Sequence, residues 1–260
     1  MKEISFQLYS ARNIPLADAL KIISSSGYTS VEAYRDNVAD IGVFQTLLSD
    51  HGLHCSSIHI GRDELRDNMS HVLDLSARLG VEQVVCPYLL LEDRPQDKAG
   101  WQQMAEELAA YATQVNAQGL TFAWHNHDFE FVKTSDGALP IRVLLDTATD
   151  MQWEIDLGWI QRASENPESW LRTYRDRVSA VHLKDVAAST DSEADASTNG
   201  NTDDEDGWAD VGHGVMDWRA IAVELNLIDN PLYVVEQDNP SDVERFAERS
   251  IATINEWDLA

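Results

Sequence analysis

The feature that most constrains the fold is an alternation, repeated eight times, of a short apolar run and a longer segment with helical periodicity. Short apolar runs are typical of parallel strands buried on both faces, and apolar residues at i, i+3 and i+4 are typical of the helices that cover them. Eight such units predict an α/β fold, a (β/α)8 or TIM barrel that forms one domain over residues 1–260. Strands are expected at residues 4–9, 29–34, 54–60, 83–88, 121–127, 152–157, 179–184 and 232–237.

An open, doubly wound sheet is the alternative architecture. It is disfavoured because no GxGxxG follows the first strand and no change in composition divides the chain. Residues 187–206 (AASTDSEADASTNGNTDDED) interrupt the alternation, with seven acidic residues, no basic residue and no large apolar side chain. This segment can bury almost nothing, so we expect a mobile, solvated acidic loop.

The charge balance bears on the partners of the protein. With 19 basic and 45 acidic side chains, the net charge of −26 disfavours binding to nucleic acids and to anionic membranes and leaves a small molecule as the expected partner. Two cysteines, Cys55 and Cys86, cannot form a disulfide framework, and no signal peptide or membrane-spanning run is present, so a cytoplasmic location is expected. The sequence leaves a homo-oligomer open.

Polar residues end several of the expected strands, where such barrels carry their catalytic groups. Alternate side chains of a strand face the barrel interior, and this parity turns His125, Asp156, His182 and Glu236 inward on four neighbouring strands. Two imidazoles and two carboxylates suit one divalent ion, with manganese, zinc, cobalt and magnesium as candidates. The alternative is an inward network of salt bridges and hydrogen bonds that holds no ion.

Two further motifs have structural alternatives. Lys184 could hold a substrate oxygen or pair with Asp238. Gly212 and Gly214 flank His213 in a sequence that suits a short glycine turn better than a phosphate-binding loop.

Five stretches resemble the sugar phosphate isomerase/epimerase group of xylose isomerase-like barrels. They are HNHDFEF (125–131), EIDLGWI (154–160), VHLKD (181–185), GWADVGHGVMDW (207–218) and VEQDNPSD (235–242). The resemblance implies a TIM barrel with one divalent ion, often manganese, that polarises a carbonyl and its neighbouring hydroxyl. Asp156, His182 and Glu236 match three of the usual ligands of that group. Many epimerases have a glutamate where this chain has His125, and that glutamate forms an acid/base pair with the glutamate of strand eight.

The resemblance implies a metal-dependent isomerase or epimerase that acts on a keto-sugar or polyol by proton transfer through an enediolate. Glu236 is the expected general base, and Lys184 or His127 the acid. Residues expected to contact the substrate are Glu32, His59, His127 and Asp238. The HNHDFEF and HLKD motifs also look like those of dehydratases or lyases that act on keto-inositols and 3-keto-sugars, which form the main alternative. An apurinic-site endonuclease, disfavoured by charge, and a non-catalytic sugar-binding barrel complete the alternatives.

Overall fold

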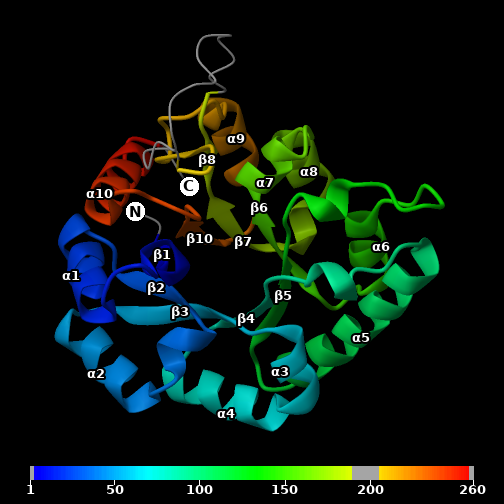
Figure 1. Cartoon of the computed structure of the whole chain (residues 1–260), viewed down its shortest axis with the longest axis horizontal. Coiled ribbons are helices and arrows are strands. Elements are labelled where there is room, and N and C mark those ends of the chain that lie inside the picture. The colour runs from blue at the N-terminus through cyan, green and yellow to red at the C-terminus, as the bar shows by residue number, and fades with distance from the viewer. Residues whose placement is uncertain (1–2, 189–204, 258–260) are drawn as a thin grey trace, which may run out of the picture.

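The structure is a computed structural model and describes residues 3–188 and 205–257. Eight parallel strands close into one barrel surrounded by helices (Figure 1). Each strand pairs with the next along the chain, and the last pairs back onto the first. The predicted TIM barrel is confirmed. Its strands are β1 (Ile4–Gln7), β2 (Ser30–Tyr34), β3 (His54–His59), β4 (Gln83–Cys86), β5 (Thr121–His125), β6 (Gln152–Asp156), β7 (Val178–Leu183) and β10 (Leu232–Val235).

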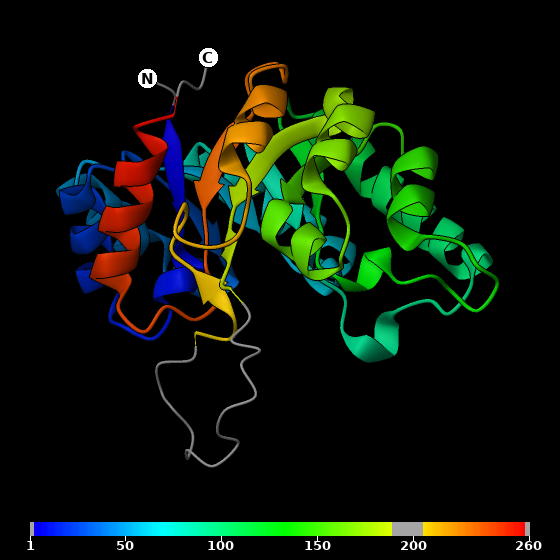
Figure 2. The same cartoon turned by 90° about the horizontal axis from the view of Figure 1, so that it is seen from above.

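Amphipathic helices form the outer ring and bury their apolar stripes against the barrel. The last of them packs beside the first and completes the ring (Figure 2). The helices are α1 (Leu16–Ser26), α2 (Ile41–Asp50), α3 (Arg62–Asp67), α4 (Met69–Leu79), α5 (Lys98–Asn116), α6 (Pro140–Thr147), α7 (Leu157–Arg162), α8 (Pro167–Tyr174), α9 (Trp218–Leu225) and α10 (Val243–Ile254).

The apolar core lies between the strands and the helices, whereas much of the barrel interior is polar. Phe122, Trp124 and Trp153, which belong to β5 and β6, are fully buried in the apolar core. Strand residues of the opposite parity, such as Glu32 and Glu154, are buried inside the barrel together with serines and glutamines. The strand alternation therefore separates a dry outer core from a polar interior that can carry chemistry.

The structure differs from the sequence expectation mainly where strands end. β1 stops at Gln7, and β5 stops at His125, because the chain turns there into the loops that form the site. Between β3 and β4 the helical segment is divided at Asn68 into α3 and α4. The helix α7 follows β6 directly and precedes α8, so two helices cover this part of the barrel. The helix α10 is capped by Asp242, whose side chain accepts a hydrogen bond from the backbone N–H of Arg245.

The acidic segment 187–206 lies mostly outside the described residues, so its expected mobility stays a prediction. At its ends, β8 (Asp185–Val186) pairs antiparallel with β9 (Trp208–Ala209), and the backbone N–H of Ala187 donates to the carbonyl of Gly207. Among the residues that are described, no helix combines the length and the apolar composition needed to cross a membrane.

Candidate metal centre and active site

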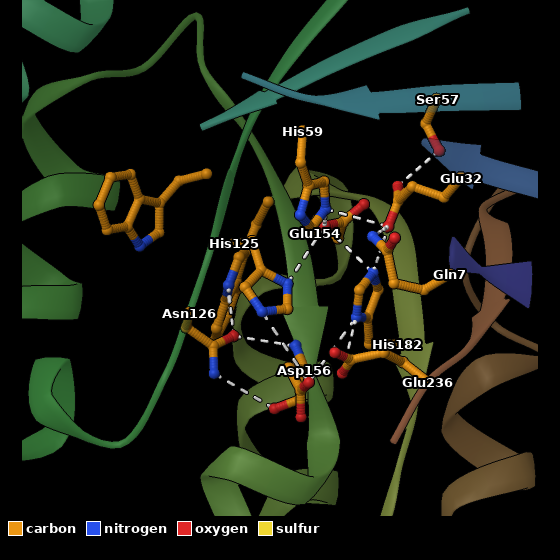
Figure 3. Close-up of polar contacts among 12 residues, drawn as sticks. Gln7, Glu32, Ser57, His59, His125, Asn126, Glu154, Asp156, His182 and Glu236 are labelled. Carbon is orange, nitrogen blue, oxygen red and sulfur yellow. Dashed lines mark hydrogen bonds and ion pairs between the residues drawn. The ribbon is translucent and has the colours of Figure 1, made fainter. Parts of the chain in front are cut away.

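Four polar side chains meet at the carboxyl ends of neighbouring strands. His125 is the last residue of β5, and Asp156 is the last residue of β6. His182 is the second-to-last residue of β7, and Glu236 directly follows β10. Register pairs Asp156 with His182, and His182 with Val234, so these strands bring their side chains to a similar height. The four side chains point toward one another (Figure 3) and are at most 5% exposed. The structure thus brings together the residues that strand parity selected.

Asp156 is fixed from two sides and keeps one oxygen free. Its Oδ1 accepts a hydrogen bond from the backbone N–H of Trp159 at 2.8 Å and caps α7, and its own N–H donates to Asn126 Oδ1 at 2.9 Å. Its buried Oδ2 has no hydrogen-bond partner among the described residues. Burial raises the pKa of Asp156 to about 7 against the opposing effect of the Lys184 ammonium. An unpartnered buried carboxylate oxygen indicates a place for a cation or a proton.

The spacing of the ligand atoms fits a single divalent ion. His182 Nδ1 lies 3.7 Å from Asp156 Oδ2 and 3.5 Å from Glu236 Oε2, and within the described part of the chain it has no hydrogen-bond partner. A tetrahedral ion with bonds of about 2.0–2.2 Å separates its ligand atoms by about 3.3–3.6 Å. His125 Nε2, 4.0 Å from Asp156 Oδ2, is placed as a fourth donor. We call the atoms His125 Nε2, Asp156 Oδ2, His182 Nδ1 and Glu236 Oε2 the upper layer.

Lys184 is a fully buried cation beside the upper layer. Its Nζ donates to Glu236 Oε2 at 2.8 Å and lies 2.9 Å from Asp238 Oδ2, so the expected pairing with Asp238 is present. The carboxylates outweigh desolvation and raise the pKa of Lys184, whereas the Lys184 ammonium holds the pKa of Glu236 well below its usual range despite burial. The aliphatic stem packs against Gly158, where a Cβ would lie 2.9 Å from Lys184 Cγ. Lys184 and Glu236 therefore form a buried ion pair beside the upper layer.

A second polar cluster lies one pleat nearer the amino ends of the strands. Its five members come from four strands, β1, β2, β3 and β6, and we call them the lower layer: Gln7, Glu32, Ser57, His59 and Glu154. His59 Nε2 lies 2.7 Å from Glu154 Oε2 and 3.0 Å from Glu32 Oε1. Against the cost of burial, these two carboxylates raise the pKa of His59 to about 10. The imidazolium of His59 thus compensates two carboxylates that are buried together.

The two histidines of the upper layer also contact the lower layer. His182 Nε2 lies 2.7 Å from Glu32 Oε1, and His125 Nδ1 lies 3.1 Å from Glu154 Oε2. Burial lowers the pKa of His182, but Glu154 and Glu32 outweigh it and raise that pKa well above its usual range. Burial and the neighbouring His182 lower the pKa of His125. Sequence reasoning missed Glu154, although strand parity turns it inward with Asp156, two residues later.

A cavity of about 550 Å³ opens at this end of the barrel. His59, His127, Glu236 and Asp238 line it, so three of the four expected substrate contacts border this space. The fourth, Glu32, is fully buried beneath the cavity and is not among its lining residues. Aromatic and basic side chains complete the wall: Tyr9, Arg12, Tyr34, Arg35, Tyr88 and Trp159.

His127 lies among aromatic rings, 4.9 Å from Tyr88 and 5.1 Å from Trp159 between ring centroids. Burial, together with the Lys184 ammonium, lowers the pKa of His127 to about 3. At neutral pH this ring is an uncharged imidazole. It is suited to accept a hydrogen bond from a substrate hydroxyl.

The glycine turn at residues 212–214 has a structural role around Asp185. The backbone N–H groups of Gly212 and Gly214 donate to Asp185 Oδ2 at 2.9 and 3.1 Å, and Trp218 Nε1 donates to the same oxygen at 2.7 Å. A Cβ at Gly214 would lie 2.2 Å from Asp185 Oδ1. The turn therefore binds a carboxylate of its own chain, as expected for a structural turn and not for a phosphate loop.

Comparison with solved structures places this architecture among related barrels. A sugar phosphate isomerase/epimerase from Parabacteroides distasonis ATCC 8503 superposes with a TM-score of 0.76 at 19% identity, over 97% of this chain and 93% of that one. The probable 3-DHS dehydratase AsbF from Bacillus anthracis gives a TM-score of 0.74 at 12% identity, over 98% and 99% of the two chains. The IolI protein, solved with a bound zinc atom, gives 0.70 at 14% identity, over 98% and 96%.

Among curated proteins, none matches the sequence. The sequence identities to these three structures are below 20%, so the comparison shows a shared fold and does not show a shared reaction. The model of one family, however, matches residues 20–257, which is most of the chain. With its closed barrel and its polar carboxyl-end site, the chain belongs to the xylose isomerase-like TIM barrel family.

Proposed function

We propose that the protein is an isomerase or epimerase that depends on a divalent ion and acts on a keto-sugar or polyol by proton transfer through an enediolate. The observation that carries this proposal is the upper layer: buried Asp156 Oδ2 and His182 Nδ1, unpartnered within the described residues, face Glu236 at the floor of an open cavity. Buried polar atoms of native proteins are nearly always satisfied, so two such atoms at ion-ligand spacing support a bound cation.

His125, Asp156, His182 and Glu236 would hold the ion. Manganese, zinc, cobalt and magnesium remain candidates, and the two imidazoles favour the first three over magnesium. Bound there, the ion supplies positive charge beside a substrate carbonyl and its neighbouring hydroxyl, where negative charge develops as a proton leaves the adjacent carbon.

The protein's own residues then divide the proton transfer. Glu236 faces the cavity and accepts the proton from carbon, and Lys184, which already donates to Glu236 Oε2, returns a proton to the product. His127 and Asp238 hold substrate hydroxyls, and His59 contacts the substrate from the cavity floor. The walls combine aromatic rings with charged and polar side chains, a lining that suits a compact polyol.

A dehydratase or lyase is the second candidate, and His125 favours it. At the end of β5, where many epimerases have a glutamate, this chain has an imidazole whose Nδ1 lies 3.1 Å from Glu154 Oε2. One base, Glu236, and one acid, Lys184, are sufficient for elimination, whereas inversion by two opposed carboxylates is not supported by this donor set.

The test combines a substitution with an exchange assay. Glu236→Gln keeps an amide oxygen that can coordinate an ion but cannot accept a proton, so solvent deuterium uptake into a panel of keto-sugars should fall about 10²- to 10⁴-fold. Bound metal is measured on the same samples, and Glu130→Gln, a buried carboxyl outside the two layers, serves as the control. Wild-type exchange by a fully loaded Glu236→Gln protein would contradict the role of Glu236. Loss of water from the substrate would select the lyase.

A further inference from the structure

The lower layer reaches across the barrel and contacts the ligands of the upper layer from beneath. Glu32 belongs to β2 and His182 to β7, yet Glu32 Oε1 lies 2.7 Å from His182 Nε2 (Figure 3). Glu32 is itself held by Gln7 Nε2 at 2.7 Å and by Ser57 Oγ at 2.5 Å. The carboxylate therefore has little freedom to turn away from the imidazole. The first three strands, which contribute no ion ligand, determine how a ligand on β7 is oriented.

The contact distances in the lower layer are shorter than those in the upper layer and indicate a different kind of interaction. In the lower layer, His59 Nε2 and His182 Nε2 each lie 2.7 Å from a carboxylate oxygen, in the range of charge-assisted hydrogen bonds. The other imidazole contacts of Glu32 and Glu154 are ion pairs of 3.0–3.2 Å, and His125 Nδ1 makes no hydrogen bond among the described residues. Contacts in the upper layer are 3.5–4.0 Å, too long for hydrogen bonds and close to the spacing of ligands around an ion. Short hydrogen bonds therefore join Glu32 to His182 and Glu154 to His59 in the lower layer, whereas the upper layer has the spacing of ion ligands.

The two ring nitrogens of His182 belong to different layers. A hydrogen on Nε2 that is donated to Glu32 leaves the lone pair of Nδ1 for an ion beside Asp156 and Glu236. His125 has the reverse arrangement: Nδ1 faces Glu154 and Nε2 faces Asp156. In proteins, a carboxylate on the far nitrogen of a metal-binding histidine fixes the ring orientation and increases its strength as a ligand.

We propose that Glu32 is a positioning residue that holds His182 with Nδ1 directed at the ion, and that Glu154 does the same for His125 through the opposite nitrogen. This inference rests on the proposed ion site and adds residues that neither touch the ion nor line the cavity. His59 completes the arrangement because its imidazolium lies between the two carboxylates and allows both to remain charged inside the barrel.

The first test measures zinc alone, with a competing chelator, on the full chain. Glu32→Gln keeps the size of the side chain but removes its charge, and the expected loss of zinc affinity is about 10- to 100-fold, as for other partners of ligating histidines. Ser57→Ala, which frees Glu32 Oε2, should give a smaller loss and guards against a misfolded Glu32 variant. Glu130→Gln removes a buried carboxyl that is bonded to Trp124 Nε1 and to the His127 N–H, and its zinc affinity should stay within about twofold of wild type.

The second readout does not depend on the ion. In wild-type protein the Nε2 proton of His182 should exchange slowly and be visible by ¹H–¹⁵N NMR, both before and after zinc is added, because it is donated to Glu32. In Glu32→Gln that resonance should shift, and in Ser57→Ala it should broaden. A merely structural role for Glu32 would lower the melting temperature without moving zinc affinity beyond the Glu130→Gln control.

The outcomes separate this inference from the proposed function. Equal zinc affinity in wild-type and Glu32→Gln proteins overturns the positioning role and leaves the proposed function intact. Two zinc ions per chain also overturn it, because the lower layer would then be an ion site. Wild-type protein that takes up no divalent ion overturns the proposed function and, with it, the ion half of this inference. In that case an unchanged Nε2 resonance in Glu32→Gln would also reject the orientation of His182 by Glu32.

Discussion

The upper and lower layers contain the same chemical groups, carboxylates and imidazoles, but differ in how these groups are satisfied. In the lower layer each carboxylate of Glu32 and Glu154 has hydrogen-bond or ion-pair partners within 3.2 Å. In the upper layer Asp156 Oδ2 and His182 Nδ1 lack hydrogen-bond partners among the described residues. A closed network stabilises a geometry, whereas an open one retains binding capacity for something absent from the chain. From this difference we infer that the lower layer supports the geometry of the site and that the upper layer binds the ion and the substrate.

The largest effect is expected from Asp156→Asn, which should weaken zinc binding by more than the roughly 100-fold upper limit for residues that only support a ligand. Asparagine can still cap α7 through its side-chain oxygen, so the fold should persist. Glu154→Gln, in the lower layer, is the matched comparison and should lose about 10- to 100-fold. Chelator competition measures both variants. An Asp156→Asn protein that loses less affinity than Glu154→Gln would reverse the roles of the layers.

A saturating ion should stabilise the folded protein because the unfolded chain has no assembled site. At a free ion concentration of 100 times Kd, the free energy of unfolding should rise by about 2.7 kcal/mol, which corresponds to about 5–10 °C in Tm for a chain of this size. Differential scanning calorimetry with and without zinc measures the shift. Glu130→Gln should keep the shift and Asp156→Asn should lose most of it. An equal shift in both variants would indicate that zinc binds elsewhere.

The His125→Glu substitution tests whether the lower layer dictates what the upper layer can contain. It restores the carboxylate found in many epimerases, but it places that carboxylate against Glu154, which lies 3.1 Å from the present imidazole. We expect His125→Glu to be destabilising, and Glu154→Gln to relieve it with a coupling energy of about 1–3 kcal/mol. Urea unfolding of the four proteins of the double-mutant cycle measures this coupling. Additive effects would show that the two positions do not interact.

Glu130 is a buried carboxyl outside both layers, and it lacks the imidazolium that compensates Glu32 and Glu154. Burial raises the pKa of Glu130 from 4.5 to about 8, so the folded state favours its protonated form. The stability that this preference provides is complete below about pH 4.5 and is lost as pH rises through about 8. Relative to Glu130→Gln, wild-type protein should lose up to about 1.4 kcal/mol per pH unit in that interval. Urea unfolding at several pH values measures the free energy of unfolding of both proteins. If the two proteins show the same dependence of this free energy on pH, the prediction is wrong.

The smallest effect is expected from deleting residues 189–204. The flanking residues are already joined by the β8 and β9 pairing, and Glu205 contacts Arg245, so a shorter connection should preserve both. Loop length contributes weakly to closure entropy, and Tm should stay within a few degrees of wild type. Zinc affinity should not change. A large decrease in either would show that the segment contributes to the core or to the upper layer.

Strand parity in the sequence predicted part of the set of residues that face the barrel interior, and Glu154 was missed. It selected His125, Asp156, His182 and Glu236, and the structure brings them together. Parity does not give the height of a residue along the barrel axis, because height depends on register between strands. The register shifts between Val31 and Glu32, an irregularity that no sequence pattern here reveals. Glu32 was therefore expected in the cavity, but it lies beneath it.

Packing also determined the features that periodicity could not predict. The short helix α7 begins immediately after β6 because Asp156 itself provides the cap, so one side chain both ends a strand and starts a helix. Glu154 has the same parity as Asp156, but its importance depends on His59 and His125, which are distant in sequence. Local pattern identified the barrel, whereas partnerships across the barrel were visible only in the structure.

The contacts of His59 and His182 have a consequence for folding. His59, from the first half of the chain, lies nearer to Glu154 of the second half than to Glu32, at 2.7 against 3.0 Å. His182, from the second half, lies nearer to Glu32 of the first half than to Glu154, at 2.7 against 3.2 Å. In each half of the barrel, one buried carboxylate therefore has its shortest contact with an imidazole from the other half. Separated half-barrels would expose incomplete charge pairs, so this exchange favours a barrel that closes and unfolds as one cooperative unit.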